Sequence, residues 1–180
     1  MYILETKTSN NPTHYILCGL PFSGKTYLGK LLQDKLAFVH VSLDEQKALA
    51  GYENVSDDDV PDEVWTNIFN NTDFLAVSAL KQGQTVVHET AFVTKKWRDR
   101  AKAVAFTAGF QSKIIFLDIA LVTIRARYEE NEIRAWRYKT PKNVFEAYIQ
   151  EFEAPSNEED VIIYDGQPPL EDWIEILRSK

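Results

Sequence analysis

The sequence predicts an α/β fold in which a parallel five-stranded sheet is covered by helices on both faces. The first observation behind this prediction is that short apolar runs alternate along the chain with longer segments of helical periodicity. The second is that Gly19, Asp44, Glu89 and Asp118 stand at or just past the ends of such runs. Because ligands in parallel folds collect at the carboxyl ends of the strands, we expect these residues to share one site.

The expected strands are short apolar runs with glycine or polar residues at their ends. Gly19 ends the first run, and the third run follows a turn at Gly83. The fourth run is the most apolar stretch of the chain. The strands are expected at residues 14–18, 38–41, 84–88, 113–118 and 161–164.

The expected helices fill the intervals between the strands. Thr94 is a suitable N-cap for one of them, and Gly109 is a natural stop at its other end. Thr140-Pro141 is a suitable start for another, since proline is favoured at the first helical position. The helices are expected at residues 25–36, 62–80, 95–108 and 121–138, from residue 141 onward, and at 170–177.

The composition is that of an ordinary globular domain, with 180 residues of which 44% are apolar and 26% charged. No apolar run approaches the roughly 20 residues that span a bilayer, and residues 1–5 do not show a signal-peptide pattern. The single cysteine, Cys18, is compatible with a reducing compartment. We therefore expect a cytoplasmic protein without a membrane segment.

The net charge of −7 argues against general nucleic-acid binding, which depends on basic surface. The basic residues nevertheless form two groups, at 95–102 and 125–142, whereas the acidic residues concentrate at 57–63 and 151–160. The charge thus favours a small substrate and does not exclude a nucleic-acid end. It leaves the oligomeric state undetermined.

The segment at 19–26 fits the pattern G-x-x-x-x-G-K-[ST] between an expected strand and an expected helix. A glycine-rich turn of this kind lets backbone N–H groups converge on phosphates, and the following helix adds its N-terminal dipole. Lys25 is expected to reach the β- and γ-phosphates of ATP, and the Thr26 hydroxyl to hold Mg²⁺. The expected nucleotide-binding residues are Gly19, Leu20, Pro21, Phe22, Ser23, Gly24, Lys25, Thr26 and Tyr27.

Two acidic residues follow the next strands in the sequence. Asp44 could orient or deprotonate a phosphoryl acceptor, or could instead be the N-cap of a helix over residues 45–49. Its place after a phosphate-binding segment favours the catalytic role. Glu89 is expected to be a partner of Mg²⁺, with a solvated turn glutamate as the alternative.

Four arginines fall within thirteen residues, interleaved with glutamates at 129, 130 and 132. One interpretation is a solvated helix with weak ion pairs between neighbouring turns. The other is a lid that closes over ATP and stabilises the charge of the transition state. We expect Arg134, Arg137 or both to reach the phosphates and to act in catalysis; the other two arginines are Arg125 and Arg127.

Residues 15–164 resemble the P-loop kinases of the polynucleotide 5'-kinase, zeta toxin and chloramphenicol phosphotransferase type, which are AAA-domain-like ATP-binding proteins. The resemblance is carried by the segment at 19–26, by Val-Ser-Leu-Asp at 41–44, by Val-Val-His-Glu-Thr at 86–90, and by the arginine-rich segment with Thr-Pro at 140–141 and Phe-Glu-Ala-Pro at 152–155. It implies a P-loop NTPase fold with a helical lid, and one kinase-like domain over residues 1–180.

The resemblance also implies roles for individual residues. In the family the aspartate corresponding to Asp44 is the base for the acceptor hydroxyl. Lys47 stands where polynucleotide kinases often place a basic residue that contacts the acceptor, and Arg98 is a further expected substrate-binding residue. The acceptor is expected to bind at a variable insert, about residues 45–80, below a lid at about residues 121–140.

The predicted function is an ATP-dependent kinase that transfers the γ-phosphoryl group of Mg-ATP to a hydroxyl of a small molecule or nucleotide. One alternative is a polynucleotide 5'-hydroxyl kinase. A second is an ATP-binding switch module that has no phosphoryl acceptor. The fold alone does not choose among them.

Overall fold

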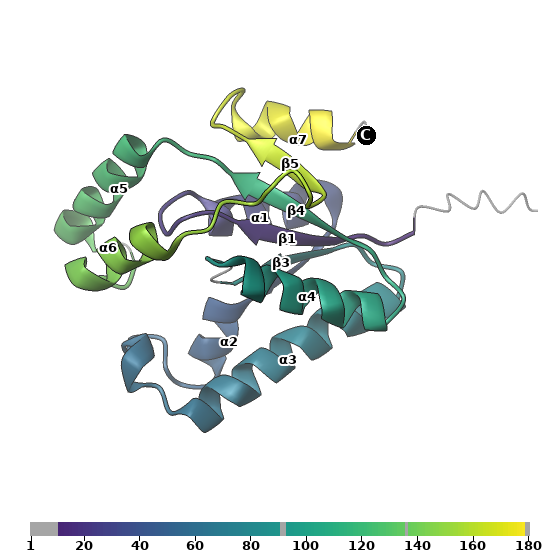
Figure 1. The fold of residues 1–180 in the computed structure, drawn as a ribbon, viewed down its shortest axis with the longest axis horizontal. Helices are drawn as coiled ribbons and strands as arrows, with labels where there is room; N and C mark the ends of the chain where they lie inside the picture. The colour runs from purple at the N-terminus through teal and green to yellow at the C-terminus, as the bar shows by residue number, and fades with distance from the viewer. Residues whose placement is uncertain (1–10, 91–92, 136, 179–180) are drawn as a thin grey trace, which may run out of the picture.

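The computed structural model describes residues 11–90, 93–135 and 137–178 of the chain (Figure 1). The N-terminal segment at 1–5, which was expected not to be a signal peptide, lies outside the described residues. Within them, no helix combines the length and the apolar character that crossing a membrane requires.

All five expected strands are present, and every pair in the sheet is parallel. The spatial order of the strands is β2-β3-β1-β4-β5, so that β1 occupies the centre of the sheet. The loop that leaves β1 therefore emerges at the middle of the carboxyl edge. The strands are β1 (His14–Cys18), β2 (Val39–Ser42), β3 (Val86–Glu89), β4 (Ser112–Leu117) and β5 (Val161–Tyr164).

Helices cover both faces of the sheet, as the alternation of elements predicts (Figure 1). Helices α1 (Lys25–Leu36) and α7 (Leu170–Arg178) pack on the face that contains Leu17 and Ile115. Helices α3 (Asp62–Lys81) and α4 (Lys95–Thr107) pack on the other face, where Ile16 and Val86 are fully buried. Successive residues of a strand point to opposite faces, which explains why buried apolar residues occupy successive positions in these strands.

The remaining helices gather beyond the carboxyl edge of the sheet (Figure 1). Two of them, α2 (Leu43–Leu49) and the short 3₁₀ helix η1 (Asp57–Asp59), precede α3. The other two, α5 (Leu121–Arg134) and α6 (Lys142–Glu151), form a pair in which Tyr128 stacks on Phe145 with ring centroids 4.2 Å apart. Phe22 of the β1–α1 loop packs edge-on against both rings, so this helix pair rests on that loop.

The structure shortens the helix that was expected at 121–138. Ala135 adopts a left-handed conformation with φ 50° and ends α5 after Arg134. The side chain of Asn131, which is fully buried, accepts a hydrogen bond from the backbone N–H of Arg137 and fixes the turn. Arg137 consequently lies in a loop and not on a helix. A smaller correction concerns Pro141, which is the N-cap of α6 and not its first residue.

Candidate active site

The β1–α1 loop, residues 19–26, is shaped by two glycines. Gly24 has φ +107° and is the N-cap of α1, a backbone conformation that residues with a side chain rarely adopt. A Cβ added to Gly19 would lie 2.8 Å from Ser23 Oγ and 3.1 Å from the carbonyl oxygen of Leu117. The loop can therefore close tightly over the end of the sheet, with the N-terminus of α1 directly behind it.

Lys25 lies inside this loop. Its ammonium donates hydrogen bonds to the carbonyl oxygens of Gly19, at 2.8 Å, and Leu20, at 3.1 Å. Burial lowers the pKa of Lys25, and the charge of Glu89 opposes that shift. The Ser23 hydroxyl is buried and has no hydrogen-bond partner in the described part of the chain. A cation and an unsatisfied hydroxyl inside a glycine-bounded loop are groups that a phosphate would satisfy.

Glu89 and Thr26 face each other across the sheet edge. The Thr26 hydroxyl donates a hydrogen bond of 2.6 Å to Glu89 Oε1, and His40 Nε2 lies 2.9 Å from Glu89 Oε2. Burial would raise the pKa of Glu89, but the contacts with His40 and Thr26 and the charge of Lys25 lower it, so the group is a carboxylate at neutral pH.

The carboxylate and the hydroxyl suit a magnesium ion that completes its coordination with water and phosphate oxygens. Described residues do not form a group of three or more His, Cys, Asp or Glu that could hold a metal by themselves. Gly29 in α1 leaves room for the His40 ring that contacts Glu89, since a Cβ at position 29 would collide with that ring.

Asp44 is the second residue of α2, and the strand before it ends at Ser42. Ser42 is the N-cap of this helix, because its Oγ accepts a hydrogen bond from the backbone N–H of Glu45 at 3.4 Å. The alternative interpretation of Asp44 as the N-cap is therefore not the arrangement in the structure. Desolvation and the nearby charge of Glu89 raise the pKa of Asp44, whereas Arg137 and Lys25 lower it. Asp44 thus shares its surroundings with Lys25, Arg137 and Glu89.

The structure separates the two lid arginines that the sequence singled out. The guanidinium of Arg137 lies 4.7 Å from the ring centroid of Phe22, directly against the loop. Arg134 has 67% of its side chain exposed and pairs with Glu130, one turn earlier on α5, at 3.2 Å. This ion pair is the kind that the solvated-helix interpretation describes.

Arg127 is a loop contact that the sequence interpretation missed. Its Nη1 donates hydrogen bonds of 3.0 Å to the carbonyl oxygens of both Phe22 and Ser23. By holding two carbonyls on the lid side, Arg127 constrains the peptide planes of the loop. The only signal in the sequence was its membership of the basic group at 125–142, which does not distinguish it from its neighbours.

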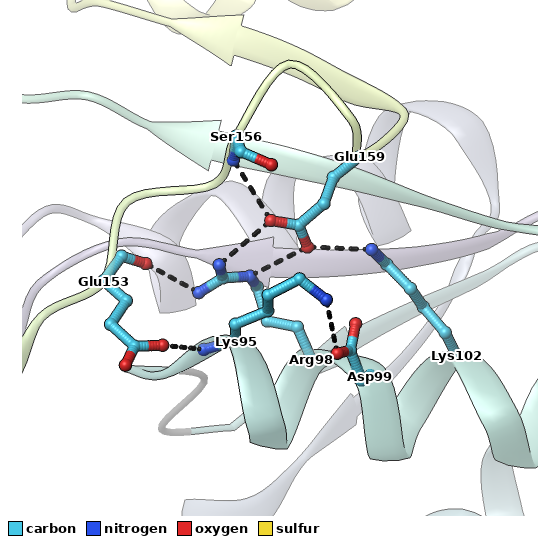
Figure 2. Close-up of polar contacts among 7 residues, drawn as sticks. All are labelled: Lys95, Arg98, Asp99, Lys102, Glu153, Ser156 and Glu159. Carbon is cyan, nitrogen blue, oxygen red and sulfur yellow. Dashed lines mark hydrogen bonds and ion pairs between the residues drawn. The ribbon is translucent and has the colours of Figure 1, made fainter.

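Two expected substrate-binding residues require correction. Arg98 has only 1% of its surface exposed, and its guanidinium binds the carboxylate of Glu159 at 3.0 and 3.2 Å and the carbonyl oxygen of Glu153 at 2.7 Å (Figure 2). It therefore joins α4 to the segment before β5 and does not face an acceptor. Lys47 is also buried, and its ammonium donates to Asp57 Oδ1 at 2.7 Å and to the carbonyl oxygen of Val55 at 2.6 Å.

The Phe-Glu-Ala-Pro segment at 152–155 has a structural explanation in the same region. Phe152 stacks on Phe116 of β4, with 5.9 Å between the ring centroids. The Glu153 carboxylate accepts a hydrogen bond from the backbone N–H of Lys95 and so caps the first turn of α4 (Figure 2). Thr94, the expected N-cap, occupies the N-cap position without a side-chain hydrogen bond. The segment thus secures the chain that leaves the lid.

Tyr27 points away from the loop. It is exposed, and its hydroxyl donates to Glu171 of α7 at 2.9 Å. Of the expected nucleotide-binding residues, those at 19–26 form the loop itself, and Tyr27 lies on the outer side of α1.

A loop of this shape at the end of the central strand, with a helical lid above it, defines a P-loop kinase fold, and solved structures of that class are similar to the chain. A candidate kinase from Chloroflexus aurantiacus J-10-fl superimposes with a TM-score of 0.74 and 18% identity, covering 94% of this chain and 98% of that one. The APS kinase CysC of Mycobacterium tuberculosis, solved with AMPPNP and APS, gives 0.67 and 15% over 94% and 96%. A gluconokinase from Sinorhizobium meliloti 1021 gives 0.66 and 14% over 92% and 89%.

The family follows from the sequence model that the chain matches. Residues 15–155 match the model described as an AAA domain, and the chain belongs to this family. No curated protein sequence matches the chain. The resemblance to P-loop kinases and the α/β fold with a parallel five-stranded sheet are thereby confirmed.

Proposed function

We propose that the chain is an ATP-dependent phosphotransferase, which transfers the γ-phosphoryl group of Mg-ATP to a hydroxyl of a small molecule or nucleotide. The observation that carries this proposal is the convergence of Lys25, the Thr26–Glu89 pair and Asp44 at the carboxyl ends of three adjacent strands. Each of these groups matches one requirement of phosphoryl transfer: a cation, a metal site, and an acceptor-orienting carboxylate.

The loop and its surroundings supply the nucleotide side of this site. Backbone N–H groups of residues 19–26 and the N-terminus of α1 would bind the phosphates, with Lys25 turning from the carbonyl oxygens of Gly19 and Leu20 to the phosphate oxygens. Bound magnesium would neutralise phosphate charge, with Thr26 and Glu89 as its protein partners. Arg137, which lies against Phe22, would add a second cation as transition-state charge develops.

Asp44 supplies the acceptor side of the proposed reaction. A carboxylate in this place accepts a hydrogen bond from the attacking hydroxyl, orients its oxygen, and takes its proton. This role favours a kinase over an ATP-binding switch, because Glu89 already supplies a carboxylate for the metal and a switch has no acceptor for a second one to orient. The N-cap function that would otherwise explain Asp44 belongs to Ser42.

The nucleotide site is tested with Lys25→Ala. Loss of the ammonium should weaken binding of a non-hydrolysable ATP analogue with Mg²⁺ and lower turnover at least about 10²-fold, because no other group replaces it on the phosphates. Calorimetry with the analogue and a labelled-ATP assay are the measurements. Lys30→Ala, which removes an exposed lysine from the same helix, is the matched control and should behave like the wild type. Equal analogue affinity in the Lys25 variant would refute the assignment of the loop.

The acceptor role is tested with Asp44→Asn. The amide should keep analogue binding within about threefold, yet lower phosphoryl transfer by roughly 10²–10⁴-fold, because it cannot take the proton. A labelled-ATP screen over sugars, nucleosides, antibiotics and 5'-hydroxyl oligonucleotides measures the transfer. If the Asp44→Asn variant transferred phosphate at the wild-type rate, the carboxylate would have no catalytic role. If the wild-type protein transferred phosphate to none of the acceptors, the ATP-binding switch would be favoured.

A further inference from the structure

Five side chains gather near Asp44, and the six residues come from five separate segments. The central contact is the ion pair between Lys47 and Asp57. Trp65 donates its indole N–H to the backbone oxygen of Asp57 at 3.1 Å. Tyr148 lies near Asp57, whose carboxylate helps to raise the pKa of Tyr148. We call this set the acceptor cluster: Asp44, Lys47, Asp57, Trp65, Tyr138 and Tyr148.

The cation of the cluster is fully engaged. Lys47 is only 8% exposed, and its ammonium contacts the Asp57 carboxylate and the carbonyl oxygen of Val55. The ring centroids of Trp65 and Tyr138 lie 5.7 and 6.0 Å from the same nitrogen. A phosphate or carboxylate on an acceptor would have to displace the carboxylate and the rings to reach this charge.

The carboxylates of the cluster outnumber this single cation. Burial raises the pKa of Tyr148 to about 12, with smaller contributions from the charges of Asp57 and Asp44, so both carboxylates act on the same place. Asp58 and Asp59 extend the negative charge along η1 and are exposed. An anionic acceptor that approaches along η1 therefore meets repulsion before it comes near Arg137 and Lys25, the cations that act on Asp44. Hydroxyl and ammonium groups on the same path meet acceptors of hydrogen bonds.

The aromatic members add a second recognition element. Trp65 is half-buried, and Tyr138 has 39% of its surface exposed, so part of each ring is open to solvent. Ring faces of this kind pack against flat or apolar faces of ligands, and the adjoining carboxylates then fix the orientation of ligand hydroxyls.

The basic residues of α4 are mostly occupied by ion pairs, which are Lys95–Asp99, Arg98–Glu159, Arg100–Asp73 and Lys102–Glu159. On the lid, Arg125 binds the Glu146 carboxylate with two nitrogens, whereas Arg127 and Arg137 contact the β1–α1 loop. The basic group at 95–102 is thus mostly compensated and offers little of the positive surface that tracks a phosphate backbone.

From these contacts we infer that the phosphoryl acceptor is an uncharged or cationic hydroxyl compound with a flat or apolar face, and that polyanionic acceptors, nucleic-acid 5' ends included, are poor substrates. This inference rests on the proposed phosphotransferase function. It narrows the range of candidate acceptors by their charge and by their shape. The Lys47–Asp57 pair decides the charge preference, and the rings of Trp65 and Tyr138 decide the shape.

The test pairs each uncharged acceptor with an anionic relative that keeps the same hydroxyl. The probes are glucose against glucose 1-phosphate, and adenosine against both adenosine 3'-monophosphate and a 5'-hydroxyl oligodeoxynucleotide, with kanamycin as a cationic probe. Transfer from γ-labelled ATP should favour the uncharged or cationic member by at least about tenfold in kcat/KM. Equal or better transfer to an anionic member overturns the inference and leaves the proposed function intact. Absence of transfer to every probe counts against the proposed function itself, and the inference falls with it.

Asp57→Asn tests the cluster directly. Removal of this charge should raise the KM of the working acceptor about tenfold and leave the KM of ATP unchanged. The substitution also removes the carboxylate that pairs with the Lys47 ammonium, so kcat/KM for the anionic relative should rise. Asp34→Asn makes the same charge change at an exposed position of α1, outside the cluster, and is the matched control. Circular dichroism during heating confirms that both variants fold. An unchanged charge preference in a folded Asp57→Asn variant overturns the assignment.

Discussion

At the scale of single residues, the cations at the phosphate loop come from two parts of the chain. Lys25 belongs to the loop and donates hydrogen bonds to the loop carbonyl oxygens of Gly19 and Leu20. Arg127 and Arg137 arrive from the lid, one on the carbonyls of Phe22 and Ser23 and the other on the face of the Phe22 ring. An arginine on a ring face has hydrogen-bond donors to spare, so a phosphate can recruit it without breaking an ion pair.

Arg137→Ala should therefore reduce phosphoryl transfer more than nucleotide binding. We expect kcat to fall by about 10- to 100-fold while the affinity for an ATP analogue changes less than about threefold, since the charge that Arg137 neutralises is greatest in the transition state. Steady-state kinetics and calorimetry measure the two effects separately.

Arg134→Ala is the control for this experiment. It removes the same charge from the same lid, at a side chain that is 67% exposed and paired with Glu130. Transfer should stay within about twofold of the wild type. If Arg134→Ala were the more damaging of the two substitutions, the lid would have to rearrange on nucleotide binding and bring α5 over the phosphates.

At the scale of elements, the sheet and α4 are joined to the segment after the lid by a buried ion pair. Arg98 of α4 and Glu159, which precedes β5, are both almost completely buried. Lys102 and the backbone N–H of Ser156 also contact the Glu159 carboxylate, so its charge is compensated (Figure 2). Burial would raise the pKa of Glu159, but the contacts with Arg98, Lys102 and Ser156 lower it to about 2.

Arg98→Ala should consequently lower the free energy of unfolding by about 3–5 kcal/mol, because it leaves the Glu159 carboxylate buried without its main partner. Urea denaturation measures the change. Lys95→Ala removes a basic residue that pairs with Asp99 on the exposed side of the same helix and should cause only a small change. Comparable losses for both substitutions would contradict the structural role of Arg98, as would a folded Arg98 variant whose only defect is acceptor binding.

At the scale of the whole molecule, a row of polar side chains in contact with one another crosses three strands of the sheet. The His14 ring of β1 contacts His88 Nδ1 of β3 at 3.1 Å and Ser112 Oγ of β4 at 2.9 Å. Burial lowers the pKa of His14 to about 4, and it lowers the pKa of His88 well below the usual value. Both imidazoles are thus neutral in the folded protein at neutral pH.

Stability should therefore decrease on acidification. Below pH 6.5 the unfolded chain takes up protons on these histidines, whereas folded His14 remains neutral down to about pH 4. Each pH unit in that window costs about 1.4 kcal/mol per histidine, which amounts to about 3 kcal/mol for His14 by the lower end. Urea denaturation of the wild type and of His14→Gln between pH 7 and 5 measures the effect. The free energy of unfolding should fall more steeply with decreasing pH in the wild type than in His14→Gln. Parallel pH dependences in the two proteins would contradict this account.

The sequence by itself determined the α/β class, the five strands, the phosphate loop, and the places of Asp44 and Glu89 at the sheet edge. These features follow from local information: a residue's position relative to a strand end fixes where it emerges, once the strands are parallel. The end of α5 was the exception, because the turn after Arg134 depends on the buried amide of Asn131.

Only the tertiary structure decided what the long cationic side chains contact. Arg127 meets the carbonyl oxygen of Phe22 across 105 positions of the chain, and Arg98 meets Glu159 across 61. Lys47 meets Asp57 across a mere 10, yet the irregular segment between them carries no periodicity that predicts the encounter. A flexible side chain with a charge at its tip binds whichever partner packing brings within reach, and packing is a property of the whole fold.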